Sequence, residues 1–164
     1  VLYIMCGVGF SGKSTLARKI SEQTGATLVS QDATYFENET KFNLDQNSDE
    51  DWETVLNICY EKIEKELTKN QSVVFDDTNH RLNLRNKLRN IADKYQTETK
   101  VIFMDTSTQV QKERVEKNKI TGERHEVKQE YLDTAIAELE VPTESENVII
   151  VEPDYDLARV ISQL

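Results

Sequence analysis

Three of the five glycines in this 164-residue sequence fall in one short segment, at positions 7, 9 and 12. The segment reads Gly-Val-Gly-Phe-Ser-Gly-Lys-Ser-Thr and matches the pattern G-x-x-x-x-G-K-[ST]. Glycine lets backbone N–H groups turn inward toward phosphate oxygens because no Cβ atom stands in the way. We therefore expect residues 7–15 to bind the phosphates of a nucleoside triphosphate.

The side chains of this segment have distinct expected roles. Lys13 supplies a cation for the β- and γ-phosphates, and the Ser14 hydroxyl suits a Mg²⁺ ion. Thr15 is a further phosphate donor at the positive N-terminus of the helix that follows. The other phosphate contacts are expected from Gly7, Gly9, Phe10, Ser11 and Gly12. The pattern predicts ATP and Mg²⁺ as cofactors, but it leaves the fate of the γ-phosphate open because switches, motors and kinases share it.

Acidic residues follow two further apolar runs. Asp32 comes after Thr27–Ser30, and the pair Asp76 and Asp77 comes after Ser72–Phe75. Ligands of open parallel sheets bind outside the carboxyl ends of the strands, so these acids are candidates for chemistry. A carboxylate beside an acceptor hydroxyl can take its proton during phosphoryl transfer, and another can orient Mg²⁺. We assign Asp32 as the base and the pair to the metal side, with a turn or helix cap as the alternative for Asp32 and for one of the pair.

Five apolar runs of strand length position these residues. They show no alternation of apolar and polar residues, which is typical of strands covered on both faces, and amphipathic segments separate them. This pattern predicts a doubly wound α/β fold with a parallel sheet, in one domain over residues 1–164. The runs are Leu2–Cys6, Thr27–Ser30, Ser72–Phe75, Val101–Met104 and Val148–Val151.

Helical periodicity marks the segments between the runs. Apolar residues at i, i+3 and i+4 spacing predict a long helix over 52–67 and further helices over 84–95, 127–139 and 157–164. Residues 37–51 interrupt this pattern with polar, acid-rich sequence, and we expect a mobile loop there. The acids that end this segment are expected to stabilise the N-terminus of the long helix: Asp49, Glu50, Asp51 and Glu53.

The composition limits the kinds of partner that the protein can bind. Twenty lysines and arginines against thirty acids give a formal charge of −10, which argues against a broad basic face for nucleic acid. No apolar run is long enough to cross a membrane. Cys6 and Cys59 lack the spacing of a zinc site and are expected to be buried, reduced thiols. With no secretory leader we expect a cytoplasmic protein, and the absence of Met at position 1 indicates that residues are missing upstream.

These residues together resemble the P-loop kinases of the polynucleotide 5′-kinase and zeta-toxin type and their predicted-kinase relatives with an AAA-type ATP-binding domain. The resemblance covers nearly the whole chain and rests on Ser14–Ala17 after the lysine, on Asp32, and on Phe75–Asn79. It implies a five-stranded sheet in the order 2-3-1-4-5 flanked by helices, with a helical lid over roughly residues 107–140. It also implies that Asp32 is the general base, and that one acid before Thr-Asn fixes substrate or metal.

The lid would supply a cation to the transferring phosphoryl group and exclude water. Arg114 and Arg124 are the candidates, with Gly122 as the pivot of the lid, and a solvated helix face is the alternative for each arginine. The lid arginine of the nucleic-acid kinases would lie near residues 119–122, where this chain has none. The segment carries its cations at Arg114, Lys117, Lys119 and Arg124.

Other basic residues receive weaker assignments. Arg81, Arg85 and Arg89 form an i, i+4, i+8 stripe that is expected to be solvated, although Arg81 lies near enough to the acids to contact an anionic acceptor. His80 and His125 have no companion at metal-ligand spacing, and no role is assigned to them.

The departures from the family pattern favour a small acceptor. Relatives that act on nucleotide chains often carry an arginine shortly after the acid of the second strand, where this chain has Tyr35 and Phe36. We expect a Mg²⁺- and ATP-dependent kinase that phosphorylates a hydroxyl of a small-molecule or nucleoside-like acceptor. The alternatives are a polynucleotide 5′-hydroxyl kinase, which the net charge disfavours, and a nucleotide-dependent binding switch without acceptor chemistry. The sequence identifies neither the acceptor nor the oligomeric state.

Overall fold

Five parallel strands form one sheet in the computed structural model, which describes residues 1–164. The strand order is β2-β3-β1-β4-β5, which confirms the predicted order and the predicted α/β class. Two strands differ from the prediction, because β3 is shifted by one residue to Val73–Asp76 and β4 begins two residues earlier, at Thr99. The strands are β1 (Leu2–Cys6), β2 (Thr27–Ser30), β3 (Val73–Asp76), β4 (Thr99–Met104) and β5 (Val148–Val151).

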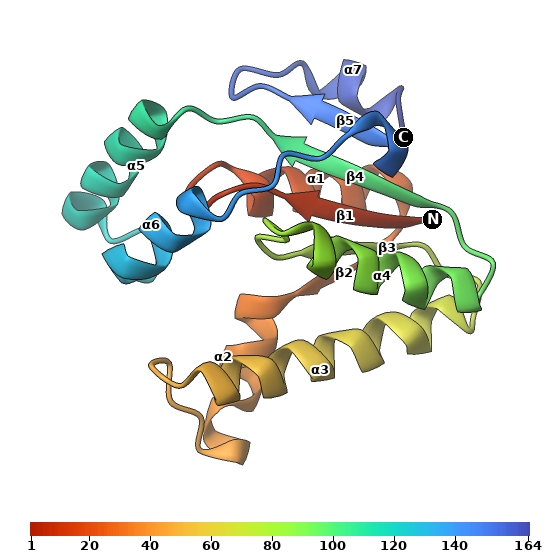
Figure 1. Ribbon diagram of the computed structural model, residues 1–164, viewed down its shortest axis with the longest axis horizontal. Helices are drawn as coiled ribbons and strands as arrows, with labels where there is room; N and C mark the ends of the chain where they lie inside the picture. Colours follow the sequence, from red (N-terminus) through yellow and green to blue (C-terminus); the bar gives the residue numbers. More distant parts are fainter.

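Helices cover both faces of the sheet (Figure 1). Helices α3 and α4 pack on one face, and α1 and α7 pack on the other. Helices α5 and α6 lie beyond the carboxyl ends of the strands, in the segment expected to form the lid. The helices are α1 (Lys13–Thr24), α2 (Gln31–Phe42), α3 (Asp49–Leu67), α4 (Leu82–Lys94), α5 (Thr108–Thr121), α6 (Gln129–Ala137), the short 3₁₀ helix η1 (Glu144–Glu146) and α7 (Leu157–Ile161).

The two faces explain why the strands are apolar throughout. In β1, Leu2, Ile4 and Cys6 belong to the core under α3 and α4, whereas Tyr3 and Met5 belong to the core under α1. Successive side chains of a strand point to opposite faces, so a strand covered on both sides has no position left for a polar residue. The end of β1 thus fixes where the phosphate-binding segment begins, and the last residue of β3 is the first acid of the pair.

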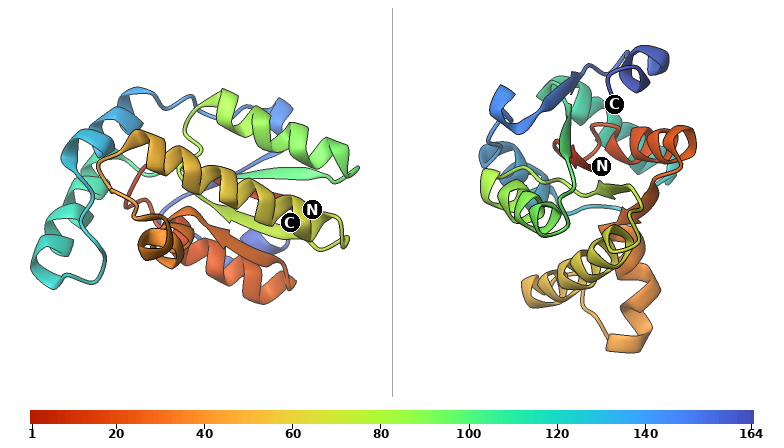
Figure 2. Two further views of the ribbon diagram at one scale, coloured as in Figure 1. Left: turned by 90° about the horizontal axis from the view of Figure 1, so that it is seen from below. Right: turned by 90° about the vertical axis from the view of Figure 1, so that its right-hand side faces the viewer.

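The predicted loop over residues 37–51 is wrong for most of its length. Residues 37–42 continue helix α2, which begins after Ser30 and ends at Asn43 with a φ of 51°. The apolar periodicity did not predict this part of α2, because its side chains face solvent. There Glu37 pairs with Lys62 at 2.7 Å. Figures 1 and 2 show α2 crossing the N-terminal part of α3 at a steep angle and extending away from the sheet. A solvent-facing helix needs no apolar stripe beyond the residues that contact its neighbour.

The long helix begins three residues earlier than predicted. The Ser48 hydroxyl accepts a hydrogen bond from the N–H of Asp51 at 3.2 Å, and the acids Asp49, Glu50 and Asp51 form the first turn of α3. Their expected role at a helix N-terminus is confirmed, because negative charge is favourable there.

The two cysteines are buried and unpaired, as predicted. Burial raises the pKa of each thiol to about 11, so both are protonated at neutral pH. No helix of the protein combines the length and the apolar character that crossing a membrane requires.

Candidate active site

The segment between β1 and α1 folds into a tight cradle. Gly7 has a φ of 143° and Gly12 a φ of 101°. A Cβ atom on Gly7 would lie 3.1 Å from the carbonyl oxygen of Met104 and 3.2 Å from the Ser11 hydroxyl. Both glycines are therefore required by backbone conformation, and Gly7 by close packing as well.

Lys13 lies inside this cradle. Its Nζ donates to the carbonyl oxygen of Val8 at 2.7 Å, and its side chain is almost fully buried. Burial lowers the pKa of this amine, and the nearby carboxylate of Asp76 acts in the opposite direction. The cation is thus held at the centre of the loop by the loop's own backbone, as binding of a polyanion requires.

The acidic residues predicted from the strand ends come together in front of the cradle. Asp76 ends β3 and is 7% exposed, and burial raises its pKa against the influence of Lys13 and of the Ser14 hydroxyl. Burial raises the pKa of Asp77 to about 6, and the charges of Asp32 and Asp76 add to the effect. The three carboxylates are therefore close enough to repel one another electrostatically.

Asp77 also makes a local contact. Its Oδ1 accepts a hydrogen bond from the N–H of Thr78 at 2.6 Å, but it does not cap the following helix, because α4 begins only at Leu82 with Arg81 as its N-cap. Asn79, the residue after Thr78, has a φ of 42°, and its side-chain amide donates to the carbonyl oxygen of Met5 at 2.8 Å. The N–H of Gly7 donates to the carbonyl oxygen of Thr78 at 2.9 Å. The acid-bearing loop is thus bonded directly to β1 and to the start of the cradle.

Arg85 corrects the expectation of a solvated arginine stripe. It is 1% exposed and donates from Nε and Nη2 to the Glu146 carboxylate at 2.7 and 3.1 Å. Its Nη1 donates to the carbonyl oxygen of Asn79 at 3.0 Å. Sequence periodicity gave no signal for this contact, because Glu146 lies 61 residues further along the chain.

The segment expected to form the lid brings several side chains onto the cradle. Arg114 donates from Nη1 to the carbonyl oxygen of Phe10 at 3.0 Å, and the guanidinium of Arg124 lies 4.4 Å from the centre of the Phe10 ring. A Cβ atom on Gly9 would lie 2.5 Å from Leu132 of α6. Gly122 ends α5 with a φ of 59°. Helices α5 and α6 therefore both contact the phosphate-binding segment.

Two adjacent residues of this segment reach Asp32, which lies in the first turn of α2. Arg124 Nη2 is 3.8 Å and His125 Nε2 is 3.7 Å from Asp32 Oδ2. His125 also meets the ring of Phe36 edge-on, with centroids 5.4 Å apart. No role was assigned to His125 from the sequence, because its approach to Asp32 depends on how the chain folds between them.

His80 connects the acid-bearing loop to the end of α6. Its Nδ1 lies 3.1 Å from the Thr78 hydroxyl, and its Nε2 lies 3.5 Å from Glu138 Oε2, which also pairs with Arg81 at 2.8 Å. The N–H of Glu140 donates to the carbonyl oxygen of His80 at 2.8 Å. Sequence reasoning missed this connection for the same reason that it missed His125.

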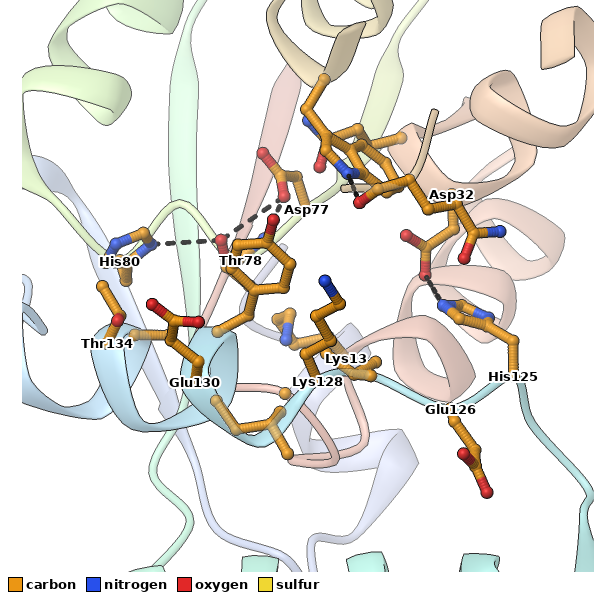
Figure 3. Close-up of a pocket in the computed structure, with 18 of the residues that line it drawn as sticks. Lys13, Asp32, Asp77, Thr78, His80, His125, Glu126, Lys128, Glu130 and Thr134 are labelled. Carbon is orange, nitrogen blue, oxygen red and sulfur yellow. Dashed lines mark hydrogen bonds and ion pairs between the residues drawn. The ribbon is translucent and has the colours of Figure 1, made fainter. Parts of the chain in front are cut away.

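Two cavities border the cradle and are lined by different residues of it. The larger, of about 740 Å³, is lined by Gly9, Lys13, Ser14 and all three acids named above. Figure 3 shows Asp32 beside His125, Asp77 beside Thr78, and Lys13 between the two groups. The smaller, of about 370 Å³, is lined by Phe10, Ser11, Gly12 and Thr15 together with Arg114, Arg124, Pro153 and Tyr155.

The residues predicted for the metal side fit Mg²⁺. The Ser14 hydroxyl lowers the pKa of the Asp76 carboxylate, which places the two groups close together. Asp77 adds a second carboxylate on the wall of the same cavity. Mg²⁺ prefers hard oxygen ligands, usually one or two carboxylates, and keeps several waters.

Comparison with solved structures finds the same fold in kinases. A candidate kinase from Chloroflexus aurantiacus is 19% identical with a TM-score of 0.80, covering 99% of this chain and 92% of that one. A gluconokinase from Sinorhizobium meliloti is 23% identical with a TM-score of 0.69, over 98% and 87%. Kti12 from Chaetomium thermophilum, in complex with ADP-AlF₃, is 19% identical with a TM-score of 0.78, over 99% and 96%. At these low identities, the TM-scores show that the chain shares the fold of these proteins.

The comparison with family models identifies the family of the chain. A comparison with curated proteins finds no match. The family model AAA_33, described as an AAA domain, matches residues 2–142, which include the cradle, the three acids and both arginine candidates. The matches do not single out the polynucleotide kinase and zeta-toxin type within this fold. The chain belongs to the AAA domain family AAA_33.

Proposed function

We propose that the protein is an ATP-dependent kinase that transfers the γ-phosphoryl group to a hydroxyl of a small-molecule or nucleoside-like acceptor. The observation that carries this proposal is the presence of two cavities beside the cradle, with Asp32 lining the larger one and not the smaller. A kinase needs separate spaces for the nucleotide and the acceptor, which meet where the phosphoryl group is transferred.

The smaller cavity suits the nucleoside of ATP. It is lined by the outer side of the cradle and by Arg114, Pro153 and Tyr155. The phosphates would then extend through the cradle past Lys13 toward the larger cavity. When bound, Mg²⁺ would neutralise charge on the phosphate oxygens, with Ser14 and Asp76 or Asp77 as its protein ligands.

The larger cavity suits the acceptor. Asp32 would take the proton from the acceptor hydroxyl as the new oxygen–phosphorus bond forms and the bond between the γ-phosphorus and the leaving ADP oxygen breaks. Arg124 lines both cavities, so its guanidinium is placed to move from Asp32 onto the transferring phosphoryl group. Arg114 is held by Phe10 on the nucleoside side, which favours Arg124 as the cation of the transfer step.

Helix α6 would exclude water from this step. Leu132 covers Gly9, and Tyr131 and Leu132 both line the larger cavity. Without such a cover, water in place of the acceptor would hydrolyse ATP.

The printed descriptions of similar structures support a small acceptor. They include a gluconokinase, a sugar kinase from Janibacter, 20% identical with a TM-score of 0.69, and the APS kinase of Mycobacterium tuberculosis, 16% identical with a TM-score of 0.67. A polynucleotide 5′ end is a less suitable acceptor because the net charge is −10.

The substitution Asp32→Asn tests the proposal. We expect phosphoryl transfer from γ-labelled ATP to the small molecules of a deproteinised cell extract to fall by about 10²–10⁴-fold, because a general base is lost. ATP affinity should change little. The matched control is Asp93→Asn, on the exposed surface of α4. Transfer near the wild-type rate in Asp32→Asn, or ATP turnover that never depends on an acceptor, would contradict the kinase assignment.

A further inference from the structure

The basic residues of the larger cavity are mostly engaged elsewhere. Lys13 donates into the cradle, and Arg124 lies over Phe10 beside Asp32. Arg81 forms an ion pair with Glu138 at 2.8 Å. Lys128, exposed on the cavity rim, has neither an acidic partner within ion-pair distance nor a hydrogen bond to the cradle. The larger cavity therefore has few free cations that could bind an anionic group of the acceptor.

Acidic residues outnumber the basic ones around the same cavity. Six of its lining residues are acidic and four are lysine or arginine. Asp49 at the start of α3 and Glu130 on α6 are exposed and make no ion pair, so no basic side chain neutralises their charges at the cavity. The six acids are Asp32, Asp49, Asp76, Asp77, Glu126 and Glu130. A cavity lined by an excess of one sign of charge raises the local concentration of ligands of the opposite sign and repels the others.

Three aromatic rings from three different helices also line the cavity: Phe36 of α2, Trp52 of α3 and Tyr131 of α6. Phe36 is 45% exposed although it is a large apolar side chain. Trp52 stacks on the buried Tyr35 with centroids 4.6 Å apart, and its Nε1 already donates to the carbonyl oxygen of Gln46 at 3.0 Å. The indole thus offers ring surface and no free donor. Aromatic faces bind the apolar face of a ring, and they attract cations.

We propose that the acceptor is a cyclic alcohol that carries no anionic group and is either neutral or amine-bearing. This inference rests on the proposed kinase function, and it specifies the charge and shape of the acceptor. The unpaired Asp49 and Glu130 disfavour carboxylate-, sulfate- and phosphate-bearing alcohols. The three rings select a molecule with a flat or apolar face.

Fractionation by charge tests this inference without knowledge of the acceptor. A deproteinised cell extract is separated by ion exchange into anionic, neutral and cationic pools, and each pool is incubated with the protein, Mg²⁺ and γ-labelled ATP. We expect labelled product from the neutral or cationic pool, and less than about a tenth as much from the anionic pool. A product made mainly from the anionic pool would overturn the inference and leave the kinase assignment standing. Transfer to no pool would instead contradict the kinase assignment on which the inference rests.

A charge variant tests the stated cause. In the double variant Asp49→Asn/Glu130→Gln, the ratio of transfer from the anionic pool to transfer from the other pools should rise by about three- to tenfold, because two negative charges are removed. A ratio within one protein is independent of how much of the variant is folded. Asp93→Asn is the matched control and should keep the wild-type ratio. An unchanged ratio in the double variant would overturn the electrostatic part of the inference.

Discussion

The two adjacent acids that follow β3 have different surroundings. Asp76 is the more deeply buried of the two, with Lys13 and the Ser14 hydroxyl beside it. Asp77 receives a hydrogen bond from its own neighbour Thr78, and burial raises its pKa to about 6. A charged carboxylate whose pKa is raised by burial destabilises the folded state, and such residues are typical of functional sites. We therefore expect Asp77 to be retained for its charge and not for folding.

This expectation has a definite pH dependence. The pKa of Asp77 is raised in the folded state, so between about pH 4 and pH 6 the folded state binds more protons than the unfolded state. The free energy of unfolding contributed by this group therefore falls as the pH rises through that range. The neutral variant Asp77→Asn, which keeps the acceptor for Thr78, should be more stable than wild type by about 1–3 kcal/mol at pH 7 to 8 and by almost nothing near pH 4.

Thermal or denaturant unfolding of both proteins across this pH range measures the difference. A stability gain that is equal at both ends of the range would show that the charge of Asp77 is not its cause. The same substitution should weaken Mg²⁺-dependent ATP binding if Asp77 is on the metal side.

The residues predictable from sequence are those whose role depends on near neighbours. Gly7, Lys13 and Ser14 lie in one contiguous pattern, and their strand-to-helix setting is local as well. His125 and Arg85 act through partners 93 and 61 residues away, Asp32 and Glu146. No pattern within a short window contains such a pair, so only the folded chain reveals it.

At the scale of elements, periodicity predicted the helices that bury an apolar stripe, including α6 beyond the sheet, and failed for the solvent-facing part of α2. Helices α3 and α4 bury one face and were found, although their ends shifted. Helix α2 beyond Tyr35 faces solvent and was predicted as a loop. The strand order could be predicted from the resemblance to P-loop kinases, since it is a property of the whole fold.

The contact between α6 and the cradle is the element-scale feature most open to test. Gly9→Ala places a methyl carbon only 2.5 Å from Leu132 Cδ2, well inside van der Waals contact. We expect a loss of about 1–3 kcal/mol in stability, as is typical of overpacking, together with more ATP hydrolysis in the absence of acceptor as α6 is displaced. In a Leu132→Ala background the added methyl group should cost much less.

A double-mutant cycle over these two positions measures the coupling between cradle and lid. If Gly9→Ala lowers the free energy of unfolding equally in the wild-type and Leu132→Ala backgrounds, the new methyl group does not contact Leu132, and α6 does not cover the cradle.

At the scale of the molecule, one buried ion pair joins the two halves of the sheet. Arg85 on α4 contacts the loop after β3, and its partner Glu146 lies in η1, just before the edge strand β5. The Glu146 carboxylate also accepts the N–H of Thr143. The pair thus holds the acid-bearing loop and the last strand in a fixed relation.

Removing one member of this ion pair should lower the stability of the protein far more than removing both. Arg85→Met leaves a buried carboxylate without its partner and should cost about 3–5 kcal/mol. The double variant Arg85→Met/Glu146→Leu should regain most of this loss, because no unpaired charge remains buried. Chemical denaturation of the two variants and wild type measures the difference. Equal losses in the single and double variants would show that the fold depends on packing of the arginine and not on its charge.

The most direct test of the kinase assignment is a crystal structure with Mg²⁺ and a non-hydrolysable ATP analogue. We expect the nucleoside in the cavity formed by Arg114, Pro153 and Tyr155, and the terminal phosphate beside Lys13, facing the cavity that Asp32 lines. A terminal phosphate turned away from Asp32, or a nucleoside bound in the larger cavity where the acceptor should lie, would contradict the assignment.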